Sequence, residues 1–275
     1  MNTTQFVNRH ISLNEADKQA MLQEIGVSGI DELIAQTIPD SIRLKEELNI
    51  SPALSEYEML AHSKELAAKN SLFDNYIGFG YHNTILPSAI QRNILENPSW
   101  YTAYTPYQAE IAQGRLEALL NFQTIVCDLT GFKLANASLL DESTAAAEAM
   151  HMFFESRTKD QRKSEANKFF VSDLVLPQTV AVLKTKAEGL GIRIVEGDHQ
   201  NHNFDESYFG VLLQYPGKNG IILDYTENIK KYKVLNLQVV VASDPMALVK
   251  LKSPAEMGAD CAVGTTQRFG IPMGY

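Results

Sequence analysis

Apolar residues along the first 70 positions recur at helical spacing and are interrupted by turn-forming residues. The spacing predicts amphipathic helices over Ser12–Ile25, Ile30–Thr37 and Ser55–Asn70. Gly26 is expected to end the first of them, because glycine readily adopts the left-handed conformation found after a helix. We therefore expect residues 1–75 to form a helical N-terminal segment.

A different pattern begins near residue 169, where short apolar runs alternate with amphipathic segments. The apolar runs predict strands over Phe169–Leu176, Ile192–Glu196, Phe209–Tyr215, Leu237–Ser243 and Asp260–Gly264. The intervening segments predict helices over Pro177–Glu188, Tyr225–Tyr232 and Pro245–Leu251. Strand–helix–strand units favour right-handed crossovers in a parallel sheet. The pattern predicts a mostly parallel, doubly wound α/β domain, in which ligands bind beyond the carboxyl ends of the strands.

Between these two parts lies an aromatic stretch, N-P-S-W-Y-T-A-Y-T-P-Y-Q, which contains Trp100 and three tyrosines. Aromatic residues interleaved with threonine and proline suit neither a plain helix nor a strand, and Pro106 lacks a backbone donor. We therefore expect an aromatic loop whose side chains line a surface. A helix should follow, beginning near Tyr107 and ending at Gly131.

A second helix start follows in the run N-A-S-L-L-D-E-S-T-A-A-A-E-A-M, which begins at Asn136. Asp141 is placed to cap this alanine-rich helix, because its carboxylate can accept from unpaired backbone N–H groups. A turn that leads into a helix N-terminus is a candidate anion site.

Upstream, the run G-F-G-Y-H ends at His82, and Pro87 is placed to start a helix at its first position. A tight turn before a core helix is the structural interpretation of this run. Contact of Tyr81 or His82 with a ligand is the functional alternative.

Several long runs resemble a known family. I-Q-R-N-I-L-E-N-P-S-W-Y-T-A-Y-T-P-Y-Q-A-E-I-A-Q-G-R-L-E and D-L-T-G-F-K-L-A-N-A-S-L-L-D-E-S-T-A-A-A-E-A-M are similar to the N-terminal half of glycine dehydrogenase (decarboxylating), the P-protein of the glycine cleavage system. F-V-N-R-H, from Phe6 to His10, and G-A-D-C-A-V-G-T-T-Q-R-F-G-I-P-M-G-Y, from Gly258 to Tyr275, agree with two further blocks. Motifs of this length are more specific than a short glycine fingerprint.

The resemblance implies an aspartate-aminotransferase-like large domain of pyridoxal-phosphate (PLP) fold type I over residues 76–275, incomplete at its C-terminal end. It also implies an activity for the complete protein, which decarboxylates glycine with PLP and passes the aminomethyl group to the lipoyl arm of H-protein. A chain that stops at M-G-Y is expected to be part of a longer polypeptide.

A PLP site needs an aspartate for the pyridinium proton, a phosphate cup at a helix start and a ring-stacking side chain. Asp244, after a buried strand, suits the first role, and Asn136 and Ser138 suit the second. Leu176 stands where the family commonly has a histidine, which places a ring-stacking role in doubt.

The Schiff-base lysine should follow the strand that ends near Gly264, but Gln267 and Arg268 occupy that place. An amide is not a nucleophilic amine, and guanidinium stays protonated, so neither can form an imine. In the family the lysine lies in the second half. We therefore expect no catalytic residue here, PLP bound through the other half, and no activity of this half alone.

In the family, the first half contributes to the wall of the active site that it forms with the second. The residues expected in that wall are Tyr101, Tyr104, Thr105 and Gln108. The alternative is that all four pack the interface between the halves. The implied partners are the C-terminal half, on the same chain or as a second subunit, glycine and lipoylated H-protein. The implied assembly is a homodimer or a two-plus-two heterotetramer.

The composition argues against several classes of protein and kinds of site. A net charge of -9 argues against a nucleic-acid-binding surface, and no apolar run reaches membrane-spanning length. Cys127 and Cys261 have no companions at metal-ligand spacing, so no metal site is expected. No arginine-rich leader appears in the sequence, so we expect a bacterial, cytoplasmic protein. The remaining alternatives are an autonomous transferase or lyase, disfavoured by the missing lysine, and a non-catalytic structural or regulatory subunit of the same fold.

Overall fold

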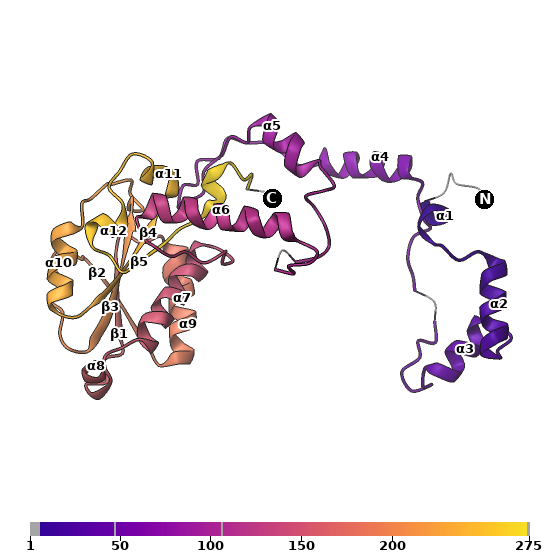
Figure 1. Cartoon of the computed structure of the whole chain (residues 1–275), viewed down its shortest axis with the longest axis horizontal. Coiled ribbons are helices and arrows are strands. Elements are labelled where there is room, and N and C mark those ends of the chain that lie inside the picture. The colour runs from indigo at the N-terminus through magenta and orange to yellow at the C-terminus, as the bar shows by residue number, and fades with distance from the viewer. Residues whose placement is uncertain (1–5, 47, 106, 274–275) are drawn as a thin grey trace. The chain divides into compact units, whose positions relative to one another are not determined.

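The computed structural model describes residues 6–46, 48–105 and 107–273. The chain divides into two compact units, Met1–Asp74 and Asn75–Tyr275 (Figure 1). Within the described ranges, no helix combines the length and the apolar character that a membrane crossing requires.

The first unit consists of helices whose ends are set by local capping. Asn14 accepts a hydrogen bond from the backbone of Asp17, and Gly26 is left-handed after the last turn, as predicted. Ser55 and Glu58 form a capping box at the start of another helix. The bounds are α1 Phe6–His10, α2 Glu15–Ile25, α3 Ile30–Thr37 and α4 Glu56–Ala67.

The second unit is built on a five-stranded parallel sheet with the order β2-β1-β3-β4-β5. All eight residues of β3 are buried, as a continuous apolar run in a parallel sheet predicts. The strands are β1 Lys168–Ser172, β2 Arg193–Gly197, β3 Tyr208–Tyr215, β4 Gln238–Ser243 and β5 Cys261–Val263. The predicted doubly wound arrangement is confirmed, because the chain reverses its direction of travel across the sheet between β2 and β3.

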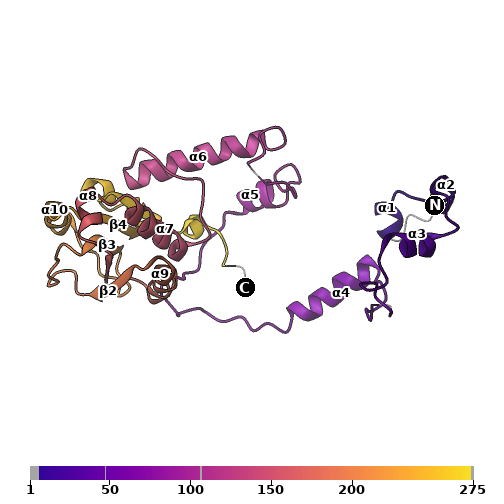
Figure 2. The same cartoon turned by 90° about the horizontal axis from the view of Figure 1, so that it is seen from below.

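Helices cover both faces of this sheet. Both views place α10 on one side of the strands and α7 and α9 on the other (Figure 1 and Figure 2). Met150, Phe153 and Leu183 belong to the core cluster on the α7 and α9 side. Ile229 and Tyr232 belong to the cluster on the opposite side. The helices of this unit beyond residue 140 are α7 Glu142–Glu155, α8 Lys159–Lys163, α9 Pro177–Leu190, α10 Thr226–Val234, α11 Pro245–Leu248 and α12 Pro254–Met257.

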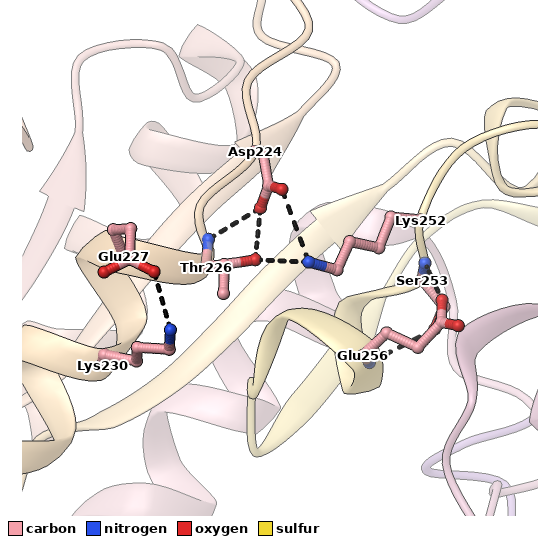
Figure 3. Close-up of polar contacts among 7 residues, drawn as sticks. All are labelled: Asp224, Thr226, Glu227, Lys230, Lys252, Ser253 and Glu256. Atoms are coloured by element: carbon pink, nitrogen blue, oxygen red, sulfur yellow. Dashed lines mark hydrogen bonds and ion pairs between the residues drawn. The ribbon is translucent and has the colours of Figure 1, made fainter.

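Polar side chains hold the loops next to α10 and α12. Lys252 Nζ donates to Thr226 Oγ1 at 2.7 Å and lies 3.4 Å from Asp224 Oδ2, so it joins the start of α10 to the loop before α12 (Figure 3). Ser253 and Glu256 form a capping box at the start of α12 (Figure 3).

The aromatic stretch differs from the prediction at its C-terminal end. Helix α6, Gln113–Thr130, begins six residues after Tyr107 and not near it. Gln108 accepts from the backbone N–H of Ala112, and Ala112 itself is non-helical (φ -122°, ψ 30°), so a separate turn precedes the helix. Its predicted end at Gly131 is confirmed. Pro106, on which part of the prediction rested, lies outside the described residues.

In the first unit, α2 begins at Glu15 and not at Ser12, and α4 ends at Ala67 and not at Asn70. Boundaries in the second unit also differ. Strand β1 ends at Ser172 and not at Leu176, because the Ser172 carbonyl accepts from Val175 N in a turn. Helix α9 continues through Gly189, and Gly191 ends it. Helix α11 ends at Leu248, three residues earlier than expected.

The helix expected after Pro87 is short and irregular. Pro87 is its N-cap and not its first helical residue, and α5, Ser88–Ile90, continues as a π-helical turn over Gln91–Leu95. The backbone N–H of Glu96 accordingly donates five residues back, to the carbonyl of Gln91.

Candidate functional site

A cavity of about 290 Å³ lies beyond the carboxyl ends of the central strands. Gln214 from β3 and Asp244 directly after β4 line it, together with Glu142 from the start of α7 and Arg268 from the turn after β5. This is the edge at which parallel α/β sheets bind ligands. The predicted position of the site is therefore supported by the geometry.

Glu142, at the start of α7, has a pKa that departs from its usual value. Glu142 follows the predicted N-cap Asp141, whose side chain accepts from Thr144 N at 2.7 Å. Burial raises the pKa of Glu142 to about 7, and the negative charge of Asp244 adds to the increase. A hydrogen bond from Gln214 Nε2 to Glu142 Oε1, 3.1 Å long, opposes this shift. This carboxyl is therefore close to half-protonated at neutral pH.

Asp244, the residue expected to hold a pyridinium proton, is already paired. Its Oδ2 lies 3.1 Å from Arg268 Nε, and its Oδ1 accepts from Met246 N at the start of α11. Both carboxylate oxygens thus have protein donors.

The close packing of β5 against β4 brings Arg268 to this aspartate. A Cβ added at Gly264 would collide with the carbonyl oxygen of Ser243, so the chain can pass here only with glycine. Gln267, at the expected lysine position, donates instead to the carbonyls of His82 (3.3 Å) and Ile271 (3.0 Å). These hydrogen bonds join the turn after β5 to the segment that contains His82. Gln267 is not among the residues that line the cavity.

A tight turn at Gly78–Tyr81 lies at one side of the cavity. The turn was predicted, but the helix after it is not a core helix, because none of its residues is buried. Gly78, Phe79 and Gly80 all have positive φ, and Gln178 Nε2 donates to the Phe79 carbonyl at 2.6 Å. His82 lines the cavity, whereas Tyr81 does not. Leu176 supplies an apolar wall where the family commonly has histidine.

The other predicted site residues lie elsewhere in the unit. The structure does not bring Asn136 and Ser138 to the cavity, because both are exposed on the loop before α7. The wall candidates Tyr101, Tyr104, Thr105 and Gln108 are also exposed and do not line the cavity. Their role in a wall shared with another part of the protein stays a prediction.

Glu142 and Gln214 were not predicted from the sequence. A weak signal for Gln214 exists, because it is the one polar side chain in the apolar run V-L-L-Q-Y of β3. Glu142 resembles any acidic residue in the first turn of a helix, where such residues are common. Only its burial against β3 distinguishes it.

The residues of this cavity do not fit PLP. A phosphate at the start of α7 would face the partly buried Glu142 carboxyl, and the acid expected to bind the ring nitrogen is paired with Arg268. No lysine occupies the position after β5. That PLP is held by the other half stays a prediction.

Comparison with known proteins identifies the family. The sequence matches the family described as the glycine cleavage system P-protein over residues 8–275. The glycine dehydrogenase (decarboxylating) of Flavobacterium johnsoniae is 57% identical over 100% of this chain and 29% of its own length. That of Nostoc sp. is 55% identical over 98% of this chain and 27% of its own length. The chain therefore spans less than a third of the curated relatives it matches.

Solved structures agree with this assignment. The crystal structure of a glycine decarboxylase (P-protein) of the glycine cleavage system, in inhibitor-bound form, matches with a TM-score of 0.82 and 29% identity, over 96% of this chain and 60% of that chain. A sphingosine-1-phosphate lyase from Burkholderia pseudomallei matches with a TM-score of 0.53 and 10% identity, over 73% of this chain and 49% of that chain, which shows the fold alone. The expected PLP fold type I is confirmed. The chain belongs to the glycine cleavage system P-protein family.

Proposed function

We propose that the chain is the part of a glycine dehydrogenase (decarboxylating) that lacks the Schiff-base lysine, and that it completes an active site whose PLP is held by the rest of the protein. The observation that carries this proposal is the match of the whole chain to relatives of that name at 57% identity. The partners would be the C-terminal part, on the same chain or as a second subunit, glycine and lipoylated H-protein. The assembly would be a homodimer or a two-plus-two heterotetramer in the bacterial cytoplasm.

The aromatic loop is the part of this chain that we assign to the active-site wall. The side chains of Tyr101 and Tyr104 are 60% and 54% exposed, and their hydroxyls have no partner among the described residues. The Tyr104 carbonyl accepts from Arg115 Nη2 on α6 at 2.7 Å, so a long helix supports the loop. Tyrosine offers an apolar ring together with a polar tip, which suits a pocket wall that must also orient a ligand.

In this proposal the chain positions the substrate and does not supply the reactive group. PLP, bound by the other half, would stabilise the negative charge that develops when glycine loses carbon dioxide. The hydroxyls of Tyr101, Tyr104 and Thr105 and the amide of Gln108 can donate hydrogen bonds to glycine or accept them from it. Holding glycine in one orientation lowers the barrier by removing rotational freedom before the reaction.

The test replaces Tyr101 or Tyr104 by phenylalanine in the full-length protein that contains this chain. Loss of one orienting hydrogen bond of about 0.5 to 1.5 kcal/mol should lower kcat/KM roughly two- to tenfold. Stability should change by less than about 0.5 kcal/mol, because both hydroxyls are exposed. The measurement is release of carbon dioxide from glycine with lipoylated H-protein present.

Tyr107→Phe is the matched control, because Tyr107 is a 60% exposed tyrosine of the same stretch that we do not assign to the wall. If the loop only packs the interface between halves, both Phe variants will turn over glycine at the wild-type rate, and Tyr101→Ala will weaken assembly. That result would reject the wall. It would favour the alternative of a non-catalytic structural subunit, to which the Arg268–Asp244 ion pair also points.

A further inference from the structure

Gln214, one of the residues that line the cavity beside α7, carries a buried acceptor without a donor. Gln214 is 5% exposed, and its Nε2 donates to Glu142 Oε1 at 3.1 Å and to the Ala242 carbonyl at 3.3 Å. Its Oε1 has no hydrogen-bond partner among the described residues. A buried, unpaired acceptor destabilises a protein by about 1–3 kcal/mol, so a donor from a ligand would be stabilising there.

The orientation of this amide follows from its neighbours. The Ala242 carbonyl can only accept, so the nitrogen of the Gln214 amide must face it. The oxygen is then fixed on the other side. An ammonium group, with three donors, can serve both Gln214 Oε1 and the Glu142 carboxylate.

The same cavity also presents cationic groups. Arg268 contacts Asp244 through Nε, and its terminal nitrogens have no partner among the described residues. Lys218 lines the cavity as well, and its Nζ forms no ion pair within the described chain. A guanidinium binds a carboxylate in a bidentate manner, and an ammonium binds it as a point charge.

We propose that this cavity binds a small α-amino acid, with its carboxylate at Arg268 and Lys218 and its ammonium at Gln214 and Glu142. A simple anion would leave the Gln214 acceptor unpaired, and a simple amine would leave the cations unused. A phosphate ester would face the Glu142 carboxyl. The inference does not rest on the proposed function, because the site contains neither the aromatic loop nor a Schiff-base lysine.

The experiment is a calorimetric titration of the 275-residue chain with glycine, and with acetate, methylamine, inorganic phosphate and PLP as separate probes. Glycine is expected to bind one to one with a Kd of about 1 mM or tighter, and each of the other probes at least about tenfold more weakly. Absence of glycine binding, or tighter binding of phosphate, PLP or acetate, would overturn the proposal.

Variants locate the binding. Arg268→Lys should weaken glycine binding about tenfold or more, because bidentate recognition is lost. Gln214→Met, which removes the acceptor at similar volume, should do the same. Lys230→Gln is the control, because Lys230 pairs with Glu227 on the exposed face of α10 and does not line the cavity. Unchanged affinity in Arg268→Lys contradicts the proposal even where Gln214→Met fails to fold.

Proton release provides a second readout. An ammonium beside Glu142 favours its ionised form, so binding near pH 7 should release up to about half a proton per site. Repeating the titration in buffers of different ionisation enthalpy measures this release. The other charged or titratable groups of the site are Asp141, Asp244, His82, Lys218 and Arg268. Glu142→Gln should abolish most of the release. Glycine binding without proton release would place the ammonium away from Glu142 and reject the proposed orientation.

Discussion

Apolar side chains are buried in the parallel sheet and exposed on helix α6. Every residue of β3 is buried, and Leu183 of α9 is 0% exposed. Helix α6, with 18 residues, is longer than α9, with 14. None of its residues is buried, and Leu120 is 65% exposed. The sheet completes its core within this unit, whereas α6 and the aromatic loop present apolar surface of the kind that marks interaction sites.

The largest effect should come from matched leucine truncations in the two regions. Leu183→Ala removes a fully buried side chain and should lower the free energy of unfolding of the chain by about 2–5 kcal/mol. Leu120→Ala, also in a helix, should change it by less than about 0.5 kcal/mol. Denaturant unfolding measures both. Similar losses in the two variants would show that α6 is packed in the isolated chain.

A second prediction concerns Glu142, the partly buried acid at the start of α7. The pKa of Glu142 is raised from 4.5 to about 7, so the folded chain keeps a proton that the unfolded chain loses between these values. The stability that this contributes is complete below about pH 4.5 and is lost as pH rises through about 7. Between pH 4.5 and 8, the free energy of unfolding should fall by up to about 3 kcal/mol more in the wild type than in Glu142→Gln. Parallel pH profiles of the two proteins would show that Glu142 titrates normally.

The third prediction compares the effect of one substitution in the chain alone and in the full-length protein. If the apolar surface of α6 is covered in the full-length protein, Leu120→Ala should cost about 2 kcal/mol there, through lost burial. The same change should cost almost nothing in the chain alone. Thermal unfolding compares the two proteins. Val234→Ala, on a side chain that is 82% exposed on α10, is the control that should cost little in both.

Local signals predicted the elements of this fold well. Asn14 and Gly26 bound α2, and Asp141 caps α7, because caps depend on residues within one turn of the helix end. The boundary of α6 was missed, because Ala112 adopts a non-helical conformation that its residue type does not suggest. Strand β1 was predicted too long for a similar reason, because apolar character continues into the turn that follows it.

The sequence alone determined the family, through long motifs, and the sheet, through buried apolar runs between turn residues. It also showed that no lysine follows β5. The tertiary structure decided what the cavity contains. Asp244 meets Arg268 from 24 residues away, and Gln214 meets Glu142 from 72 residues away. Such contacts depend on strand order and register, which set the neighbours of a side chain across the sheet and which short-range patterns along the chain do not encode.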